Sequence, residues 1–147
     1  MITVKHILAK KGPGVWTVLP TQTVYEALQV MAEHNVGCLP VVDKDGKLAG
    51  MFSERDYARK VILKGKASKE TLVEELMTRQ VYFVKPTRTV QDCMMLFSVK
   101  KIRHLPVMFN GELQGLISIG DAVNSIISEQ ADQIESLERY ISSGGYG

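Results

Sequence analysis

Two polar pairs with the same spacing stand out in this 147-residue chain, Ser53-x-x-Asp56 and Ser118-x-x-Asp121. Each follows a run of β-prone residues and comes before a segment with helical periodicity. A helix N-terminus with open N–H groups and a hydroxyl can bind a phosphate. A carboxylate one turn later can accept hydrogen bonds from a ribose diol. The two pairs therefore favour nucleotide binding.

The same residues also have a purely structural interpretation. Ser53 and Ser118 can cap the helices, and Asp56 and Asp121 suit the positive end of the helix dipole. The two interpretations are compatible. We favour nucleotide binding over capping alone, because the pair recurs while the residues inside it differ between the two stretches.

The sequence contains no pattern typical of a catalytic site. It lacks the GxGxxG and Walker phosphate loops, HExxH and the Gly-x-Ser-x-Gly elbow. The histidines His6, His34 and His104 have no spacing with Cys or carboxylates that suggests a triad or a metal site. The acidic turn at 43–46 resembles a calcium loop only superficially, and a hairpin turn explains it. We predict no enzyme, no catalytic residue, no catalytic cofactor and no metal site.

The elements that position the polar pairs come from one unit written twice. Residues 15–31 match residues 81–97 at an offset of 66, and residues 39–56 match residues 105–121 with one residue gapped at the turn. This self-similarity indicates a duplication.

The similarity continues upstream, in the segments that lead into each copy. Residues 4–8 mirror residues 73–77 at an offset of 69, and the three extra residues of the first copy lie around Gly12-Pro13-Gly14, a loop insertion. Residues 65–80 are predicted to form a linker and a short lead-in helix for the second copy.

Each copy predicts the order β-α-β-β-α. A short β run, at 15–18 or 81–84, ends near a proline, and Thr23 or Thr89 follows at a helix N-cap position. Two β runs joined by an Asp-Gly or Asn-Gly turn come next, and a second helix starts after each Ser. One unit alone leaves an apolar sheet face uncovered. We therefore expect an α+β (or α/β) fold in which two repeats pack sheet to sheet about a pseudo-twofold axis.

The composition is that of a globular protein, with 45% hydrophobic and 23% charged residues. A net charge of +2, with Lys and Arg dispersed, implies no nucleic-acid partner. Cys38 and Cys93 have no CxxC spacing and are expected to be reduced, buried thiols. We see no signal peptide and no apolar run long enough to span a membrane, so we expect a cytoplasmic protein.

The ordered pattern L-P-V-V-D-x-x-G-x-L-x-G-x-x-S-x-x-D, with its second version from Leu105, resembles a tandem pair of CBS domains. The resemblance covers residues 1–127 and is to a Bateman-type module of the stand-alone bacterial or archaeal type. It implies a first CBS domain at 1–66, a second at 67–127 and a helical tail at 128–147. It also implies a homodimer, with a regulated protein as a possible further partner.

The resemblance implies a regulatory module that senses an adenosine-containing ligand (AMP, ADP, ATP, NAD(H) or S-adenosylmethionine) in two clefts between the copies. In that family the Ser contacts phosphate, the Asp holds the ribose hydroxyls, and the backbone before the Leu-Pro strand lines the pocket. The segment 78–81 should close over the base. The implied nucleotide-binding residues are Val36, Gly37, Cys38, Ser53, Arg55, Asp56, Thr78, Val81, Ile102, Arg103, His104, Ser118 and Asp121.

The two copies differ in charge near these positions. Arg103-His104 in the second copy stand where the first has Gly37-Cys38, and Arg55 stands where the second has Gly120. Related modules often place basic residues here against ligand phosphates. Arg55 and Arg103 could instead be solvated surface charges, and His104 could be a hydrogen-bonded core residue.

Other functions stay open at this point. A structural interaction module would keep the fold without binding a nucleotide, and a nucleotide-handling enzyme would need a base or metal that the sequence does not show. The tail carries a partial apolar helical stripe. It could pack against its own module or cover a neighbouring subunit.

Overall fold

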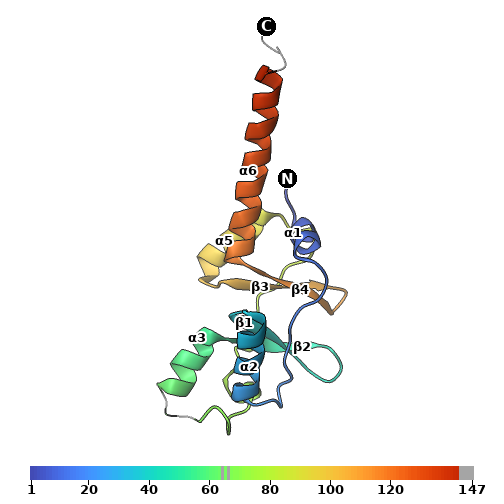
Figure 1. Ribbon diagram of the computed structural model, residues 1–147. Coiled ribbons are helices and arrows are strands. Elements are labelled where there is room, and N and C mark those ends of the chain that lie inside the picture. The colour runs from blue at the N-terminus through green and yellow to red at the C-terminus, as the bar shows by residue number, and fades with distance from the viewer. Residues whose placement is uncertain (64, 66, 143–147) are drawn as a thin grey trace.

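The helices of the chain follow the order that the duplication predicts (Figure 1). The computed structural model describes residues 1–63, 65 and 67–142. The helices are α1 (Val4–Lys11), α2 (Val24–His34), α3 (Glu54–Asp56), which continues into the π-helix η1 (Tyr57–Ile62), α4 (Val73–Leu76), α5 (Val90–Lys100) and α6 (Ile119–Ser142).

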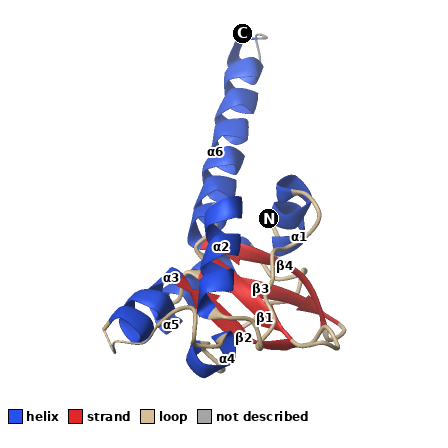
Figure 2. Ribbon diagram, turned by 60° about the horizontal axis from the view of Figure 1, so that its bottom comes forward, coloured by secondary structure: helices blue, strands red, loops and turns tan. Residues whose placement is uncertain are grey.

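Two antiparallel β-hairpins lie next to each other at the centre of the molecule, with helices on their outer sides (Figures 1 and 2). In the first copy β1 (Cys38–Val42) pairs with β2 (Leu48–Ser53), and in the second β3 (His104–Phe109) pairs with β4 (Glu112–Ser118). This arrangement confirms the mixed α and β fold expected from the repeat.

The hairpin turns differ between the copies. In the second turn both Asn110 (φ 52°) and Gly111 (φ 77°) have positive φ, as the Asn-Gly signal predicts. In the first turn only Gly46 (φ 79°) does, and Asp43 shapes the loop by accepting hydrogen bonds from the Asp45 and Lys47 N–H groups at 2.9 Å. Both signals mark a turn, with different backbone geometry.

The first β run of each copy is shorter than expected. Instead of strands at 15–18 and 81–84, the first copy has one parallel bridge, in which the Val18 N–H donates to the Pro40 carbonyl at 3.1 Å. Extending the bridge in one direction would require an N–H donor from Pro40, and extending it in the other would require one from Pro20. Proline has no backbone N–H. Prolines therefore stop the pairing at both ends. The corresponding residues of the second copy are Val84, Pro86, Pro106 and Val107.

Threonine caps begin the long helices at the predicted positions. Thr23 Oγ1 accepts the Glu26 N–H at 3.1 Å, and Thr89 Oγ1 accepts the Asp92 N–H at 3.1 Å. These bonds satisfy N–H groups that the first turn of a helix leaves open. The two caps fix α2 and α5 at equivalent places in the two copies.

Each lead-in helix packs into the hydrophobic core of the other copy. Val4 and Ile7 of α1 are buried in the core of the second copy, whereas Val73 and Leu76 of α4 are buried in the core of the first. Neither core is therefore complete without a segment from the other copy. The domain boundaries 1–66 and 67–127 stay a prediction. In space, each of the two lobes, defined by the first and second cores, contains a lead-in helix from the other copy.

α6 extends well beyond the rest of the molecule (Figure 1). Its first turns pack on the second core through Ala122 and Ile126, but residues 130–142 are all exposed. The alternative in which the tail packs along its own module is therefore wrong for this part of the helix. Within residues 1–63, 65 and 67–142, no helix has the length and apolar character needed to cross a membrane.

Candidate functional site

The Ser53 and Asp56 side chains form a reciprocal cap at the junction of β2 and α3. The Ser53 N–H donates to Asp56 Oδ2 at 3.0 Å, and the Asp56 N–H donates to Ser53 Oγ at 3.2 Å. Ser118 and Asp121 repeat the arrangement between β4 and α6, at 2.9 and 3.1 Å. The capping interpretation is confirmed in both copies.

A segment of the second copy completes the surroundings of Asp56. The Thr78 backbone pairs with Met51 of β2 through two hydrogen bonds of 2.8 and 2.9 Å. Thr78 Oγ1 then lies 3.3 Å from Asp56 Oδ1, and Lys60 Nζ lies 3.1 Å from the same oxygen. The predicted segment at Thr78 therefore lies at the first Ser-x-x-Asp pair.

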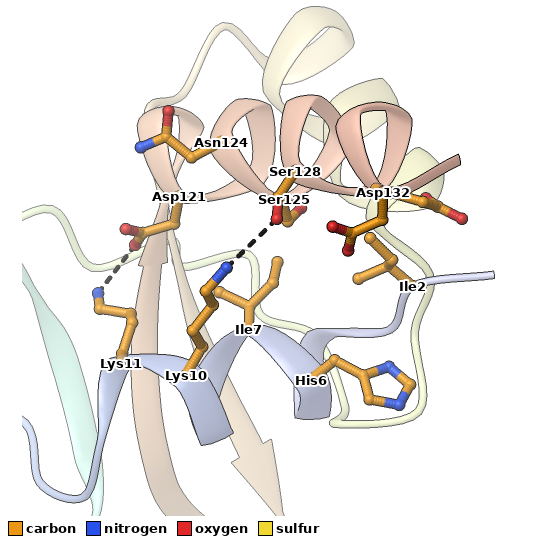
Figure 3. A pocket seen from close by; sticks show the side chains of 11 residues that line it. Ile2, His6, Ile7, Lys10, Lys11, Asp121, Asn124, Ser125, Ser128 and Asp132 are labelled. Carbon is orange, nitrogen blue, oxygen red and sulfur yellow. Dashed lines mark hydrogen bonds and ion pairs between the residues drawn. The ribbon is translucent and has the colours of Figure 1, made fainter. Parts of the chain in front are cut away.

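A segment of the first copy likewise reaches Asp121. Lys11, the last residue of α1, places its Nζ 2.8 Å from Asp121 Oδ2 (Figure 3). The same Nζ lies 2.8 Å from the Leu116 carbonyl oxygen. Leu116 is the counterpart of Met51 in the repeat, so a lysine ammonium takes the place of a backbone N–H. Each carboxylate is thus bordered by the lead-in segment of the opposite copy.

The residues before each Leu-Pro strand lie beside these pairs. The Gly37 carbonyl accepts the Glu54 N–H at 3.0 Å, and the Arg103 carbonyl accepts the Ile119 N–H at 3.0 Å. Cys38 is paired with Ser53 in the first hairpin, as His104 is with Ser118 in the second. The structure therefore brings together the expected pocket-lining backbone and the Ser-x-x-Asp motif in both copies.

Burial and the nearby charges perturb the titrating groups of the two sites. Burial raises the pKa of the Cys38 thiol to about 12, and the Asp56 charge adds to the rise. Burial also lowers the pKa of His104; Asp121 opposes this, while Lys11 and Arg103 reinforce it. Burial alone would raise the pKa of Asp121, but hydrogen bonds from Lys11 and the Ser118 backbone outweigh it, so that pKa lies below its usual value.

The remaining predicted site residues make no side-chain contact with the Ser-x-x-Asp pairs among the contacts described above. The Val36 and Ile102 side chains pack against the first and second cores, so any contribution to a ligand would come from their backbone. Val81 is half-buried, whereas Arg55 and Arg103 are exposed. Both arginines are accessible to a solute.

Two lysines at the sites were missed from the sequence. Lys60 follows Asp56 by one helical turn, a spacing that typically forms an ion pair, and could have been recognised. Lys11 lies 110 residues from Asp121 in the sequence. The one sequence feature that could have drawn attention to Lys11 is its place directly before the insertion that breaks the repeat. In the part of the chain that the structure describes, no group of three or more His, Cys, Asp or Glu side chains could hold a metal ion.

Known proteins share this architecture. The family model for the CBS domain matches residues 1–63 and 73–128. The CBS domain-containing protein CBSX3, mitochondrial, of Arabidopsis thaliana is 39% identical over 153 residues, covering 98% of this chain and 73% of the relative.

Solved structures give the same result. A protein with CBS domains from Burkholderia ambifaria superimposes with a TM-score of 0.83 at 47% identity, covering 87% of this chain and 96% of the other. CBSX2, solved in complex with AMP, has a TM-score of 0.74 at 26% identity, covering 88% of this chain and 99% of the other. The chain belongs to the CBS-domain family and carries two CBS segments in tandem.

Proposed function

We propose that this protein is a regulatory, non-catalytic module that binds adenosine-containing nucleotides (AMP, ADP, ATP or NAD(H)) at two sites, one at Asp56 and one at Asp121. In each site the carboxylate would accept hydrogen bonds from the ribose diol. The serine hydroxyl and the N–H groups of the following helix would face phosphate.

One observation carries this proposal. The Ser-x-x-Asp pair occurs at a strand-to-helix junction in both copies, and in each the lead-in segment of the other copy meets the carboxylate. Capping alone would not require a second segment at this place. A site built from two segments distant in sequence is typical of a ligand cleft.

The AMP complex of CBSX2 supports the choice of ligand class. A structural module that binds no nucleotide and a sensor of S-adenosylmethionine are the alternatives. The second differs in ligand charge, because S-adenosylmethionine carries a sulfonium and an amino acid in place of phosphates. Titration with both classes separates the two.

The test is calorimetric titration with AMP, ATP, NADH and S-adenosylmethionine into protein shown by mass spectrometry to be ligand-free. Asp56→Asn and Asp121→Asn should each lose one binding site, because an amide accepts less well from a diol. Asp92→Asn is the matched control, since Asp92 holds the same third position of a capped helix, in α5, outside both sites.

Ligand-bound protein should also melt at a higher temperature. A ligand at one hundred times its Kd stabilises the folded state by about 2.7 kcal/mol. If no nucleotide binds, or if both Asp variants keep the wild-type stoichiometry, the proposed sites are wrong.

We further propose that the protein is a homodimer and that α6 contributes to the interface. Ile127, Ile134 and Ile141 recur every seven residues with Leu137 between the last two, and each is more than half exposed. Isoleucine at position a with leucine at position d of a heptad favours two-stranded coiled coils. The occupant would be α6 of a second copy. A regulated partner protein and a cytoplasmic setting remain part of the proposal.

A further inference from the structure

The carboxylate of the second site is already engaged by a cation from another part of the chain. Lys11 Nζ lies 2.8 Å from Asp121 Oδ2, the oxygen that also accepts the Ser118 N–H. Figure 3 shows the Lys11 side chain rising from α1 toward Asp121. A ribose diol bound to this carboxylate would approach the region that the ammonium occupies.

The repeat shows that this lysine is an addition to the second site. Lys11 corresponds to Gln80 in the other copy, and Thr78, which meets Asp56, corresponds to Ala9. The first site has its own lysine, Lys60, but this residue is on the same helical segment as Asp56. Among the residues that the structure describes, the Asp121 carboxylate is thus the one of the two that is paired with a cation from a separate element.

Other contacts hold the end of α1 beside this site. Leu8 packs so closely on β4 that a Cβ atom added to Gly115 would lie 2.7 Å from Leu8 Cδ2. Lys10 Nζ lies 3.4 Å from Ser128 Oγ of α6. Between α1 and α6 lies a pocket of about 440 Å³, lined in part by Lys10, Lys11 and Asp121 (Figure 3). The Lys11 side chain therefore has room to move while α1 stays in place.

We propose that Lys11 is a built-in competitor at the second site: an adenosine ligand binds Asp121 only when the Lys11 ammonium moves away. The inference rests on the proposed nucleotide sites. The lysine and aspartate side chains are 42% and 24% exposed, and partly exposed ion pairs are weak enough for a ligand to displace. Binding at Asp121 thereby becomes coupled to the C-terminal end of α1.

The proposal makes the two sites unequal in a defined way. Replacing Lys11 by methionine keeps an unbranched side chain that is one heavy atom shorter and removes the charge. The Lys11→Met variant should bind adenosine at the second site about twofold to fivefold more tightly than the parent protein, the change expected for losing a weak competing ion pair. Adenosine is the probe because it has no phosphate that Lys11 could attract.

The experiment uses the full chain with the first site silenced by Asp56→Asn. Adenosine and AMP are titrated into this protein with and without Lys11→Met, and binding is followed by NMR and calorimetry. Lys10→Met is the matched control, because it removes the neighbouring lysine of α1, whose contact is with Ser128 and not Asp121. In protein that keeps Lys11, adenosine should also shift the backbone amide signals of Lys11 and Gly12.

The outcomes separate this inference from the function on which it rests. If the wild-type protein binds neither adenosine nor AMP, the nucleotide sites and the competitor role both fail. If the wild-type protein binds, but Lys11→Met leaves adenosine affinity unchanged or weakens it, only the competitor role fails. An equal gain from Lys10→Met would also overturn it, since a general charge effect would then explain the result.

Discussion

Asp56 and Asp121 each form two kinds of interaction through one carboxylate. Each accepts a hydrogen bond from the backbone of the serine that starts its helix, and each meets a side chain from the other copy. The local contact stabilises the helix start, and the distant one joins the two lobes. A ligand at either carboxylate would therefore act on the junction between the lobes.

The exposed arginines should distinguish ligands by their number of phosphates. Arg55→Ala and Arg103→Ala are each expected to weaken ATP binding by about tenfold, because a hydrogen bond to a charged group contributes about 1.5–3 kcal/mol. The loss should be smaller for AMP and slight for adenosine. Calorimetry with the three ligands measures this trend. A uniform loss would indicate damaged packing, and no loss would make both arginines solvated surface charges.

The buried Cys38 thiol should make the protein less stable at alkaline pH. In the unfolded chain the thiol ionises near its ordinary pKa, 9.0, whereas in the folded protein the pKa is raised to about 12. Between these values the unfolded state releases a proton that the folded state keeps, so stability falls as pH rises, by up to about 1.4 kcal/mol per pH unit. Cys38→Ala should show a shallower fall.

Urea unfolding at several pH values between 8 and 10.5 measures this slope. Other titrating groups contribute equally to both proteins, so only the difference in slope matters. Parallel curves for the wild type and Cys38→Ala would contradict the prediction.

At the scale of elements, the lead-in helices explain why a glycine recurs in the second strand of each hairpin. Gly50 and Gly115 are equivalent in the repeat, and at each the opposite lead-in segment lies so close that an added Cβ atom would be 2.7 Å from it. Neither has a positive φ, so close approach, and not backbone conformation, requires glycine. The segments that approach them also carry Thr78 and Lys11 to the two sites.

The two glycines should differ in their tolerance of a methyl group. At Gly50 an added Cβ would lie 2.7 Å from the Thr78 carbonyl oxygen, which is backbone, whereas at Gly115 it would meet the end of the flexible Leu8 side chain. Gly50→Ala should therefore lower the free energy of unfolding by about 1–3 kcal/mol. Gly115→Ala should cost less, because Leu8 can move. Urea denaturation of both variants tests this order, and an equal or reversed cost would contradict it.

At the scale of the whole molecule, the most unusual feature is the exposed second half of α6. Most apolar residues of the other elements lie in two cores, although Met95 and Val99 of α5 are exposed. The second half of α6 buries none of its residues and presents Ile134, Leu137 and Ile141 to solvent. Glu135 and Arg139 in this half form an ion pair with each other on the helix surface, at positions off the apolar stripe. The residue pattern of this half of α6 is therefore that of one helix of a coiled coil.

Disrupting this stripe should convert a dimer to a monomer, or weaken it strongly, without unfolding the chain. Ile134→Glu places a charge at the centre of the proposed seam, and the residue makes no contribution to either core. Ser136→Glu adds the same charge two residues away, at an exposed position off the stripe, and should leave the dimer intact. Sedimentation velocity over a range of concentrations provides the measurement. A monomeric wild type, or the same mass for all three proteins, would reject the role of α6.

The sequence by itself determined the duplication, the helix starts, the hairpins and the family. These features depend on local chemistry, since Thr23 and Thr89 cap helices, Gly46 and Gly111 mark turns, and apolar spacing follows the geometry of each element. It also identified the two Ser-x-x-Asp pairs as candidate site residues, because the serine and the aspartate of each pair are only three residues apart.

Only the tertiary structure decided what surrounds those pairs. The first β run forms one bridge instead of a strand because Pro40, in the neighbouring strand β1, has no N–H to extend the pairing. This effect of Pro40 arises only when the fold brings it beside Val18. The exchange of lead-in helices depends on packing between the two copies, and the contact of Lys11 with Asp121 joins residues that lie 110 positions apart. Periodicity reports which face of a helix is apolar but not which core receives it, so the sequence could not assign either helix to its lobe.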